Sequence, residues 1–277
     1  MKVYENNGLT FNEYGNGEFL SVSAASKSIQ IADIPSKFMG IPVTHVSENG
    51  FSGCSRLISV TIPESITDIG LDAFEGCKAI REVCVESIGV WCDITFWNSQ
   101  ASPIFCGERA ELYVSGERVT ELTVPYGITE IKPYSFKGFS SLKRVAMPDG
   151  IARIGHGAFF GCRSLESIDL PDSITYVGEE AFLDCTTITR ISLPSNTPII
   201  RQLTFCGCTS LSDISLPVVL ESIGHRAFYG CLSLKNILLP EGLINIGNEA
   251  FAGCTSLDCM SIPSSVETIG INAFSKQ

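Results

Sequence analysis

Cysteine is the residue in this sequence with the most varied chemistry, because its thiol can bind metal, form a disulfide or act as a nucleophile. The chain of 277 residues holds 12 cysteines. Seven of them lie three residues after a phenylalanine: Cys54, Cys77, Cys162, Cys185, Cys208, Cys231 and Cys254. The other five are Cys84, Cys92, Cys106, Cys206 and Cys259. Because no two cysteines form a C-x-x-C pair, the spacing argues against a zinc site.

The regular spacing of the seven cysteines favours a packing role, since a free cysteine behaves as a small apolar residue. Neighbouring thiols of such a ladder would lie roughly 5 Å apart. Their parallel, equally oriented Cβ vectors are nevertheless poorly placed for disulfide geometry. We therefore expect a ladder of reduced thiols, and so many unpaired cysteines favour a reducing or anaerobic setting.

The three histidines, His45, His156 and His225, do not form a catalytic or metal-binding group. His156 and His225 are 69 residues apart, which is three repeats and roughly 14 Å. We expect them to be solvent-facing loop residues. No G-x-S-x-G, P-loop or G-x-G-x-x-G motif is present. An enzyme is the least favoured hypothesis, with Cys92 or Cys106 as its nucleophile, and no cofactor or metal is expected.

The elements that position these residues are set by an internal repeat of 23 residues. Phenylalanine recurs at this interval at Phe51 and Phe74, and again at Phe136, Phe159, Phe182, Phe205, Phe228, Phe251 and Phe274. A proline and an Ile-Gly or Val-Gly pair recur in the same phase. The gap from Phe74 to Phe136 is 62 residues, which is not a multiple of 23, so an irregular segment lies between them.

One repeat, residues 165–187, explains how the unit folds. Leu165, Ile168 and Leu170 alternate with polar residues as a short strand does, and Pro171 ends the strand because it cannot donate to a ladder. Val177 returns to the core before the next bend. One repeat cannot bury its apolar residues alone, so neighbouring repeats must stack in parallel.

This pattern resembles the BspA-like leucine-rich repeat family over residues 29–274. The resemblance implies an α/β repeat solenoid, a right-handed superhelix with a curved parallel β-sheet. We predict one continuous solenoid with an N-terminal cap and expanded first coil over 1–50, including a hairpin over 8–22. Regular repeats then cover 51–83 and 119–277, with an irregular insert at about 84–118. Local departures from the pattern are Phe139 for cysteine, Asp184 for glycine, and 201–204 before Phe205.

Composition limits the partners. The net charge of −11, with scattered Lys and Arg, argues against nucleic acid and against an anionic membrane surface. No charge-free stretch reaches the ~18 apolar residues of a spanning helix, so no membrane insertion is expected. The first eight residues lack the apolar region of a signal peptide, and we expect none in this chain.

Two groups of residues are candidates for recognition. The first comprises outward strand positions on the predicted concave sheet: Ser59, Thr61, Glu82, Cys84, Glu121, Thr123, Arg144, Ala146, Ser167, Asp169, Arg190, Ser192, Asp213, Ser215, Asn236, Leu238, Cys259 and Ser261. The second comprises the insert aromatics Trp91, Phe96, Trp97 and Phe105. The alternative for the strand positions is that they form only a solvated face of the sheet. The alternative for the aromatics is that they form a small core within the insert rather than an interface.

The favoured function is protein binding. The family resemblance implies a bacterial surface or secreted protein that adheres to host or bacterial macromolecules. An intracellular, cytoplasmic scaffold or structural repeat domain is the alternative, because we expect no signal peptide in this chain and expect its cysteines to be unpaired.

Overall fold

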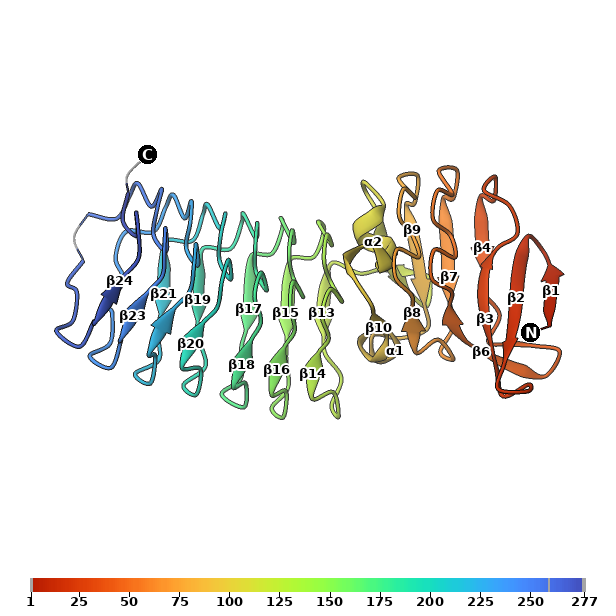
Figure 1. Cartoon of the computed structure of the whole chain (residues 1–277), viewed down its shortest axis with the longest axis horizontal. Helices are drawn as coiled ribbons and strands as arrows, with labels where there is room; N and C mark the ends of the chain where they lie inside the picture. Colours follow the sequence, from red (N-terminus) through yellow and green to blue (C-terminus); the bar gives the residue numbers. More distant parts are fainter. Residues whose placement is uncertain (1, 259, 276–277) are drawn as a thin grey trace. The chain divides into compact units, whose positions relative to one another are not determined.

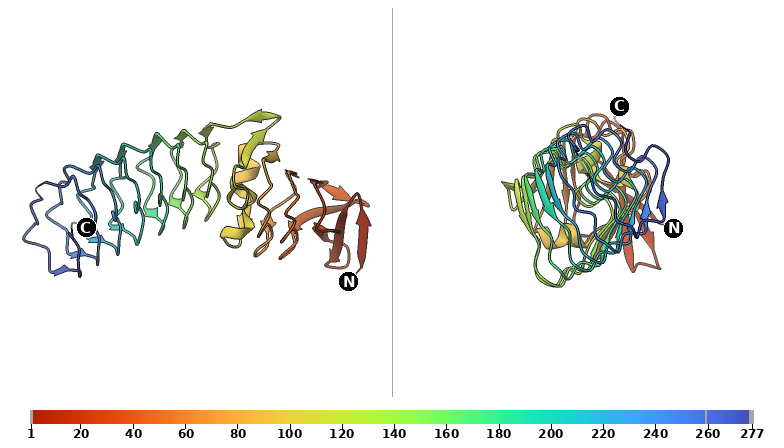
Figure 2. Two further views of the ribbon diagram at one scale, coloured as in Figure 1. Left: turned by 90° about the horizontal axis from the view of Figure 1, so that it is seen from above. Right: turned by 90° about the vertical axis from the view of Figure 1, so that its left-hand side faces the viewer.

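The computed structural model describes residues 2–258 and 260–275 (Figure 1). The described chain forms two compact units. The first contains the residues up to Val119 together with Lys132–Phe139, and the second contains Thr120–Ile131 and the residues from Ser140 onward. Each unit is a stack of coils, and most coils contribute one strand to each of two sheets (Figure 2).

The first sheet of the first unit arises from the L-x-x-I-x-L segments. Its strands follow the order β12-β11-β9-β7-β4 and are parallel except for the β11–β12 hairpin. Their bounds are β4 Ile31–Asp33, β7 Ser59–Ile62, β9 Glu82–Val85, β11 Glu111–Val114 and β12 Glu117–Arg118. Val60 and Val83 point into the core, whereas their neighbours Ser59 and Glu82 point outward.

The second sheet of this unit begins with the N-terminal strands. Strands β2 and β3 pair antiparallel, so the hairpin predicted over 8–22 is present. Strand β3 then pairs in parallel with β6, β6 with β8, and β8 with β10. The bounds are β1 Val3–Asn6, β2 Leu9–Tyr14, β3 Phe19–Ala24, β5 Lys37–Phe38, β6 Ile41–Val46, β8 Asp68–Ile69 and β10 Thr95–Phe96.

The irregular segment contains short helices. Helix α1 (Ile88–Asp93) starts at Ser87, whose Oγ accepts a hydrogen bond of 3.2 Å from the Val90 amide, as a typical N-cap does. A 3₁₀ turn η1 (Ser99–Ala101) and helix α2 (Pro103–Cys106) follow. Proline suits the first position of α2, because an amide hydrogen at that position would have no acceptor within the helix.

The second unit is regular. Its first-sheet strands are β13 Glu121–Thr123, β15 Arg144–Ala146, β17 Ser167–Asp169, β19 Arg190–Ser192 and β21 Asp213–Ser215. Its shorter strands are β14 Glu130–Ile131, β16 Arg153–Ile154, β18 Tyr176–Val177, β20 Ile199–Ile200, β22 Ser222–Ile223, β23 Asn245–Ile246 and β24 Thr268–Ile269. These strands pair in parallel.

The core of each unit is a ladder of phenylalanines beside a ladder of cysteines. Phe182 is fully buried and stacks on Phe159 and Phe205 with ring centroids 5.6 and 5.5 Å apart. The thiol of Cys208 donates a hydrogen bond of 3.2 Å to the carbonyl of Phe182 in the preceding coil. The same bond joins Cys77 to Phe51, Cys185 to Phe159, Cys231 to Phe205 and Cys254 to Phe228. The expected ladder of buried thiols is confirmed at these positions.

The departures from the repeat are accommodated locally. Asp184 occupies the position where most coils have glycine, and its φ is +58°, a left-handed conformation that aspartate tolerates better than most residues. Phe139 is fully buried in place of a cysteine. Thr204, which replaces a buried alanine, is 1% exposed and satisfies its hydroxyl by donating to the Arg201 carbonyl at 2.9 Å.

The architecture is therefore a β-solenoid of repeats, and it fits the leucine-rich-repeat expectation. Strands and turns make up the regular coils of the described residues. The two α-helices and the 3₁₀ turn lie within residues 88–106, so the helical half that an α/β repeat implies is small.

Candidate binding face

The period of two in the first-sheet strands creates a continuous polar face in the second unit. Val145, Ile168 and Ile191 are buried, whereas the residues on either side of each are exposed. We call this exposed row the strand face: Glu121, Thr123, Arg144, Ala146, Ser167, Asp169, Arg190, Ser192, Asp213 and Ser215. Register aligns Glu121 with Arg144 and Ser167, and Arg190 with Asp213.

Opposite charges are paired across neighbouring strands of this face. Arg190 Nε lies 3.3 Å from Asp213 Oδ2, and Arg144 Nε lies 4.0 Å from Glu121 Oε1. All four side chains are more than half exposed. Exposed pairs contribute at most about 1 kcal/mol to stability, so these charges are poorly explained as structural supports. The four side chains instead give the strand face acidic and basic groups that are accessible to a partner.

Two hollows open on the strand face. The larger, of about 510 Å³, is lined by Ser167, Asp169, Thr189, Arg190 and Ser192, where β17 and β19 belong to separate hydrogen-bonded sheets. It combines carboxylate, guanidinium and hydroxyl groups, which can donate to and accept from a polar ligand.

The smaller hollow, of about 340 Å³, is lined by Asp213, Ser215, Leu216, Asn236 and Leu238. Leu238 is 88% exposed. Leu238 thus places an apolar side chain beside the polar groups of the strand face. Protein interfaces commonly combine apolar and polar side chains in this way.

The remaining strand candidates behave in different ways. In the first unit, Glu82 is exposed, whereas Ser59 and Thr61 are half-buried. Thr61 donates a hydrogen bond of 2.9 Å to Asp33 Oδ1. Cys84 is half-buried, and burial raises the pKa of its thiol. Ser261 is exposed, and Cys259 lies outside the described residues.

The insert aromatics do not form one patch. Trp91 is fully buried and its Nε1 donates a hydrogen bond of 2.8 Å to the Ser135 carbonyl. Phe96 is 3% exposed, and its ring centroid lies 5.1 Å from that of Trp91. These two residues form a core, which corrects their assignment as partner contacts, because a buried ring is inaccessible. Phe105 is half-buried with Lys137 Nζ 4.4 Å above its ring, whereas Trp97 is 61% exposed.

The thiols suggested as nucleophiles are not activated. Burial raises the pKa of the Cys92 thiol to about 12, with Asp93 adding to the shift. Burial also raises the pKa of the Cys106 thiol to about 12. A nucleophilic cysteine needs a lowered pKa, so both environments favour the unreactive thiol at neutral pH.

The histidines contact neighbouring coils and are half-buried, so they are less solvent-facing than predicted. His225 Nδ1 lies 3.0 Å from the Asn248 carbonyl, and His156 Nε2 lies 3.7 Å from Glu180. Among the described residues, no group of three or more His, Cys, Asp or Glu is arranged to hold a metal ion. In that same part of the chain, no helix is both long and apolar enough to cross a membrane.

The repeat geometry agrees with comparisons to known proteins. The model of the BspA type leucine rich repeat region matches residues 23–103, 110–217 and 186–277, with six copies. The chain belongs to this family. No curated protein matches this BspA-type chain.

Several solved structures resemble this BspA-type protein, including the following three. A leucine-rich repeat protein from Eubacterium ventriosum is 19% identical, covering 98% of this chain and 93% of that chain, with a TM-score of 0.58. The pneumococcal vaccine antigen PcpA is 18% identical, with coverage of 97% and 78% and a TM-score of 0.50. A leucine rich cell surface protein from Faecalibacterium prausnitzii is 21% identical, with coverage of 100% and 92% and a TM-score of 0.49. At these identities the likeness concerns the fold.

Sequence reasoning missed one group of residues. Tyr14, Phe19 and His45 stack in a row on the second sheet of the first unit, near the exposed Trp97. The end of strand β10 carries a usable signal, because adjacent residues of an extended segment point to opposite faces, so Phe96 and the following Trp97 are not both expected in the core. No comparable signal in the sequence brings Tyr14 and Phe19 to the same place.

Proposed function

We propose that this BspA-type chain is a protein-binding repeat domain and that the strand face of its second unit recognises the partner. The observation that carries the proposal is the exposed row of alternating charges, with two hollows opening on it. Repeat proteins commonly bind through such extended faces, because stacked coils repeat the same outward positions over many strands.

The partner we propose is a host or bacterial macromolecule, and the setting is the bacterial surface or the secreted fraction. This finer step rests on the family resemblance, since fold alone does not establish function. An intracellular scaffold is the second candidate, and the row of reduced cysteines favours it. Fractionation of cells expressing the natural gene separates the two: surface or medium location supports adhesion, and exclusive cytosolic location supports the scaffold.

A binding screen tests the proposal. Purified chain is applied to immobilised host matrix proteins, bacterial surface proteins and a carbohydrate panel, alongside a double variant with Arg144→Glu and Arg190→Glu. We expect a protein ligand to be captured by the natural chain and lost by the double variant. If the double variant still captures the ligand, recognition does not use the strand face. If the natural chain captures no ligand, the scaffold is favoured.

A further inference from the structure

The second sheet of the first unit has a recessed surface of its own, made of residues that do not belong to the strand face. A hollow of about 330 Å³ opens over β3, β6 and β8 and is bordered by Trp97 just after β10. We call it the aromatic groove and define it by Tyr14, Phe19, His45, Glu48, Asp68 and Trp97. Its volume falls in the range of small-ligand pockets.

Aromatic rings form the walls of the groove. Phe19 stacks on Tyr14 with ring centroids 5.4 Å apart and on His45 with centroids 4.7 Å apart. Tyr14 is 42% exposed and Trp97 is 61% exposed. Single exposed aromatics are ordinary, but several around one hollow expose apolar surface at a position where a ligand can cover it.

Contacts between coils hold the backbone that carries Trp97. The Trp97 amide donates a hydrogen bond of 3.2 Å to the Ile69 carbonyl, and the next residue, Asn98, bonds Asp72 Oδ1 through its Nδ2 at 2.7 Å. At Gly70 a Cβ would lie 2.6 Å from the Glu48 backbone nitrogen, so only glycine allows the coils to approach this closely. The backbone on this side of the groove is thus preorganised, which lowers the entropy cost of binding.

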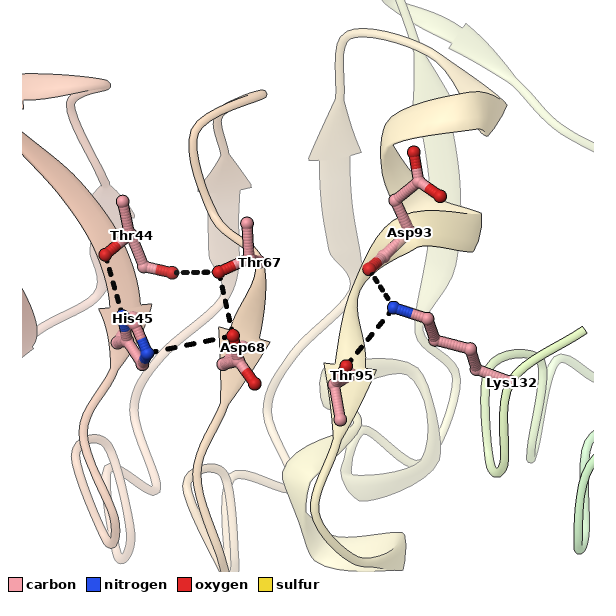
Figure 3. A network of polar contacts seen from close by, with 7 residues as sticks. All are labelled: Thr44, His45, Thr67, Asp68, Asp93, Thr95 and Lys132. Carbon is pink, nitrogen blue, oxygen red and sulfur yellow. Dashed lines mark hydrogen bonds and ion pairs between the residues drawn. The ribbon is translucent and has the colours of Figure 1, made fainter. Parts of the chain in front are cut away.

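Charge selects the class of ligand. Two carboxylates, Glu48 and Asp68, border the groove, and its lining within the described residues contains no Lys or Arg. Asp68 Oδ2 accepts from Thr67 Oγ1 at 2.8 Å and lies 3.7 Å from His45 Nε2, whereas Oδ1 points away from both (Figure 3). The nearby Lys132 donates to the Asp93 carbonyl and to Thr95 Oγ1 instead (Figure 3).

A polyhydroxyl ligand fits the groove less well than a cation does. The hydroxyls of Ser21 and Ser47 bond each other at 2.8 Å, and Thr44 Oγ1 bonds His45 Nδ1 at 2.7 Å (Figure 3). These groups are already engaged, so few remain for sugar hydroxyls. Aromatic faces combined with carboxylates instead attract an organic cation, through cation–π and ionic interactions.

We propose that the aromatic groove binds a lysine or arginine side chain from a basic segment of a partner protein. The alkyl stem of such a side chain covers the exposed rings of Tyr14 and Trp97 while its charged end meets Asp68 and Glu48. The net charge of −11 attracts such a segment over a longer range. This inference does not depend on the strand face, so either site can fail without the other.

The test uses a fluorescent acetyl-Lys-Gly-Lys-Gly-Lys-Gly peptide and its Ser-Gly counterpart, with binding to the full chain followed by anisotropy at low salt. We expect saturable binding of the basic peptide only. Trp97→Ala should weaken it about tenfold without altering the charge, and Asp68→Asn with Glu48→Gln should weaken it similarly. Trp97→Phe, which keeps a ring, should retain most of the affinity.

The matched control is Tyr126→Ala, which removes an aromatic side chain that is 89% exposed in the second unit. It should leave the affinity within about twofold, while circular dichroism verifies folding. Equal affinity of the Trp97→Ala and Tyr126→Ala variants would overturn the proposal, because binding would then be diffuse electrostatic attraction. Preferential binding of the neutral peptide or of a neutral oligosaccharide such as maltoheptaose would overturn it too.

Discussion

At the scale of single residues, burial decides what the cysteines can do. Cys208 and Cys185 are fully buried, and desolvation raises the pKa of each thiol well above its ordinary value. Each thiol also donates to a phenylalanine carbonyl of the preceding coil. A cysteine at this position of the repeat is therefore small enough for the core and still donates a hydrogen bond to a buried carbonyl. A disulfide would remove that donor.

The first prediction concerns the two cysteines of the irregular segment. A rise of the thiol pKa from 9.0 to about 12 at Cys92 and Cys106 lowers the thiolate fraction at pH 7. Each should thus react with iodoacetamide roughly a thousandfold more slowly than an unperturbed thiol, as measured by peptide mapping with mass spectrometry. The same chain in urea should react at the ordinary rate. Faster labelling of either thiol in the folded chain than of glutathione would revive the nucleophile hypothesis.

At the scale of elements, the phenylalanine ladder connects one coil to the next. An interior ring of the ladder lies about halfway between two others, such as Phe228 between Phe205 and Phe251, with ring centroids 5.5 and 5.1 Å away. Because a coil buries its apolar residues only against neighbouring coils, stability depends on these contacts between repeats.

The second prediction is that Phe182→Ala lowers the free energy of unfolding of the second unit by about 3–5 kcal/mol. The substitution removes a fully buried ring that stacks on both neighbours and leaves a cavity between coils. Urea denaturation measures the change. Tyr126→Ala, at an exposed site, should change the free energy by less than about 0.5 kcal/mol. Equal effects of the two substitutions would contradict a ladder that holds the coils together.

The third prediction concerns the irregular segment and the turn it packs against. Trp91→Phe removes the Nε1 donor of the bond to the Ser135 carbonyl and leaves that buried acceptor unpaired. We expect the free energy of unfolding of the first unit to fall by about 1–3 kcal/mol. Trp97→Phe, the same change at an exposed tryptophan, should have an effect below about 0.5 kcal/mol. A larger loss from Trp97→Phe would contradict the assignment of core and surface.

Sequence periodicity predicts the regular elements well because their pattern is local. The inward Ile168 and outward Ser167 and Asp169 follow from alternation, and the cysteine ladder follows from a constant phase. Spacing alone does not place the aromatics of the irregular segment. Trp91 looked as suitable for an interface as Trp97 does, and its burial depends on Ser135, 44 residues away.

The aromatic groove was unpredictable for a similar reason. Tyr14 and Phe19 belong to an N-terminal hairpin outside the repeat, and they meet His45 only because β3 pairs with β6. A register shift between Leu20 and Ser21 helps set which residues face each other. Such pairings depend on tertiary contacts that no repeat consensus encodes.

At the scale of the whole molecule, stacked coils give each unit polar surfaces on which neighbouring strands repeat the same outward positions. The strand face of the second unit has both signs of charge, whereas the aromatic groove of the first unit has only carboxylates among its charged lining residues. The two surfaces therefore suit different ligands: the first a polar protein surface of mixed charge, the second a basic segment.

The fourth prediction concerns the strand face, and its measurement is the affinity for the partner captured in the screen, by surface plasmon resonance. Arg144→Glu with Arg190→Glu should weaken binding at least about tenfold, because charge reversal opposes a complementary partner surface. The matched control, Arg153→Glu with Arg226→Glu, reverses two arginines that are also ion-paired but lie off the strand face. The control should retain nearly full affinity. Equal losses in the two double variants, or none in the first, would contradict recognition by the strand face.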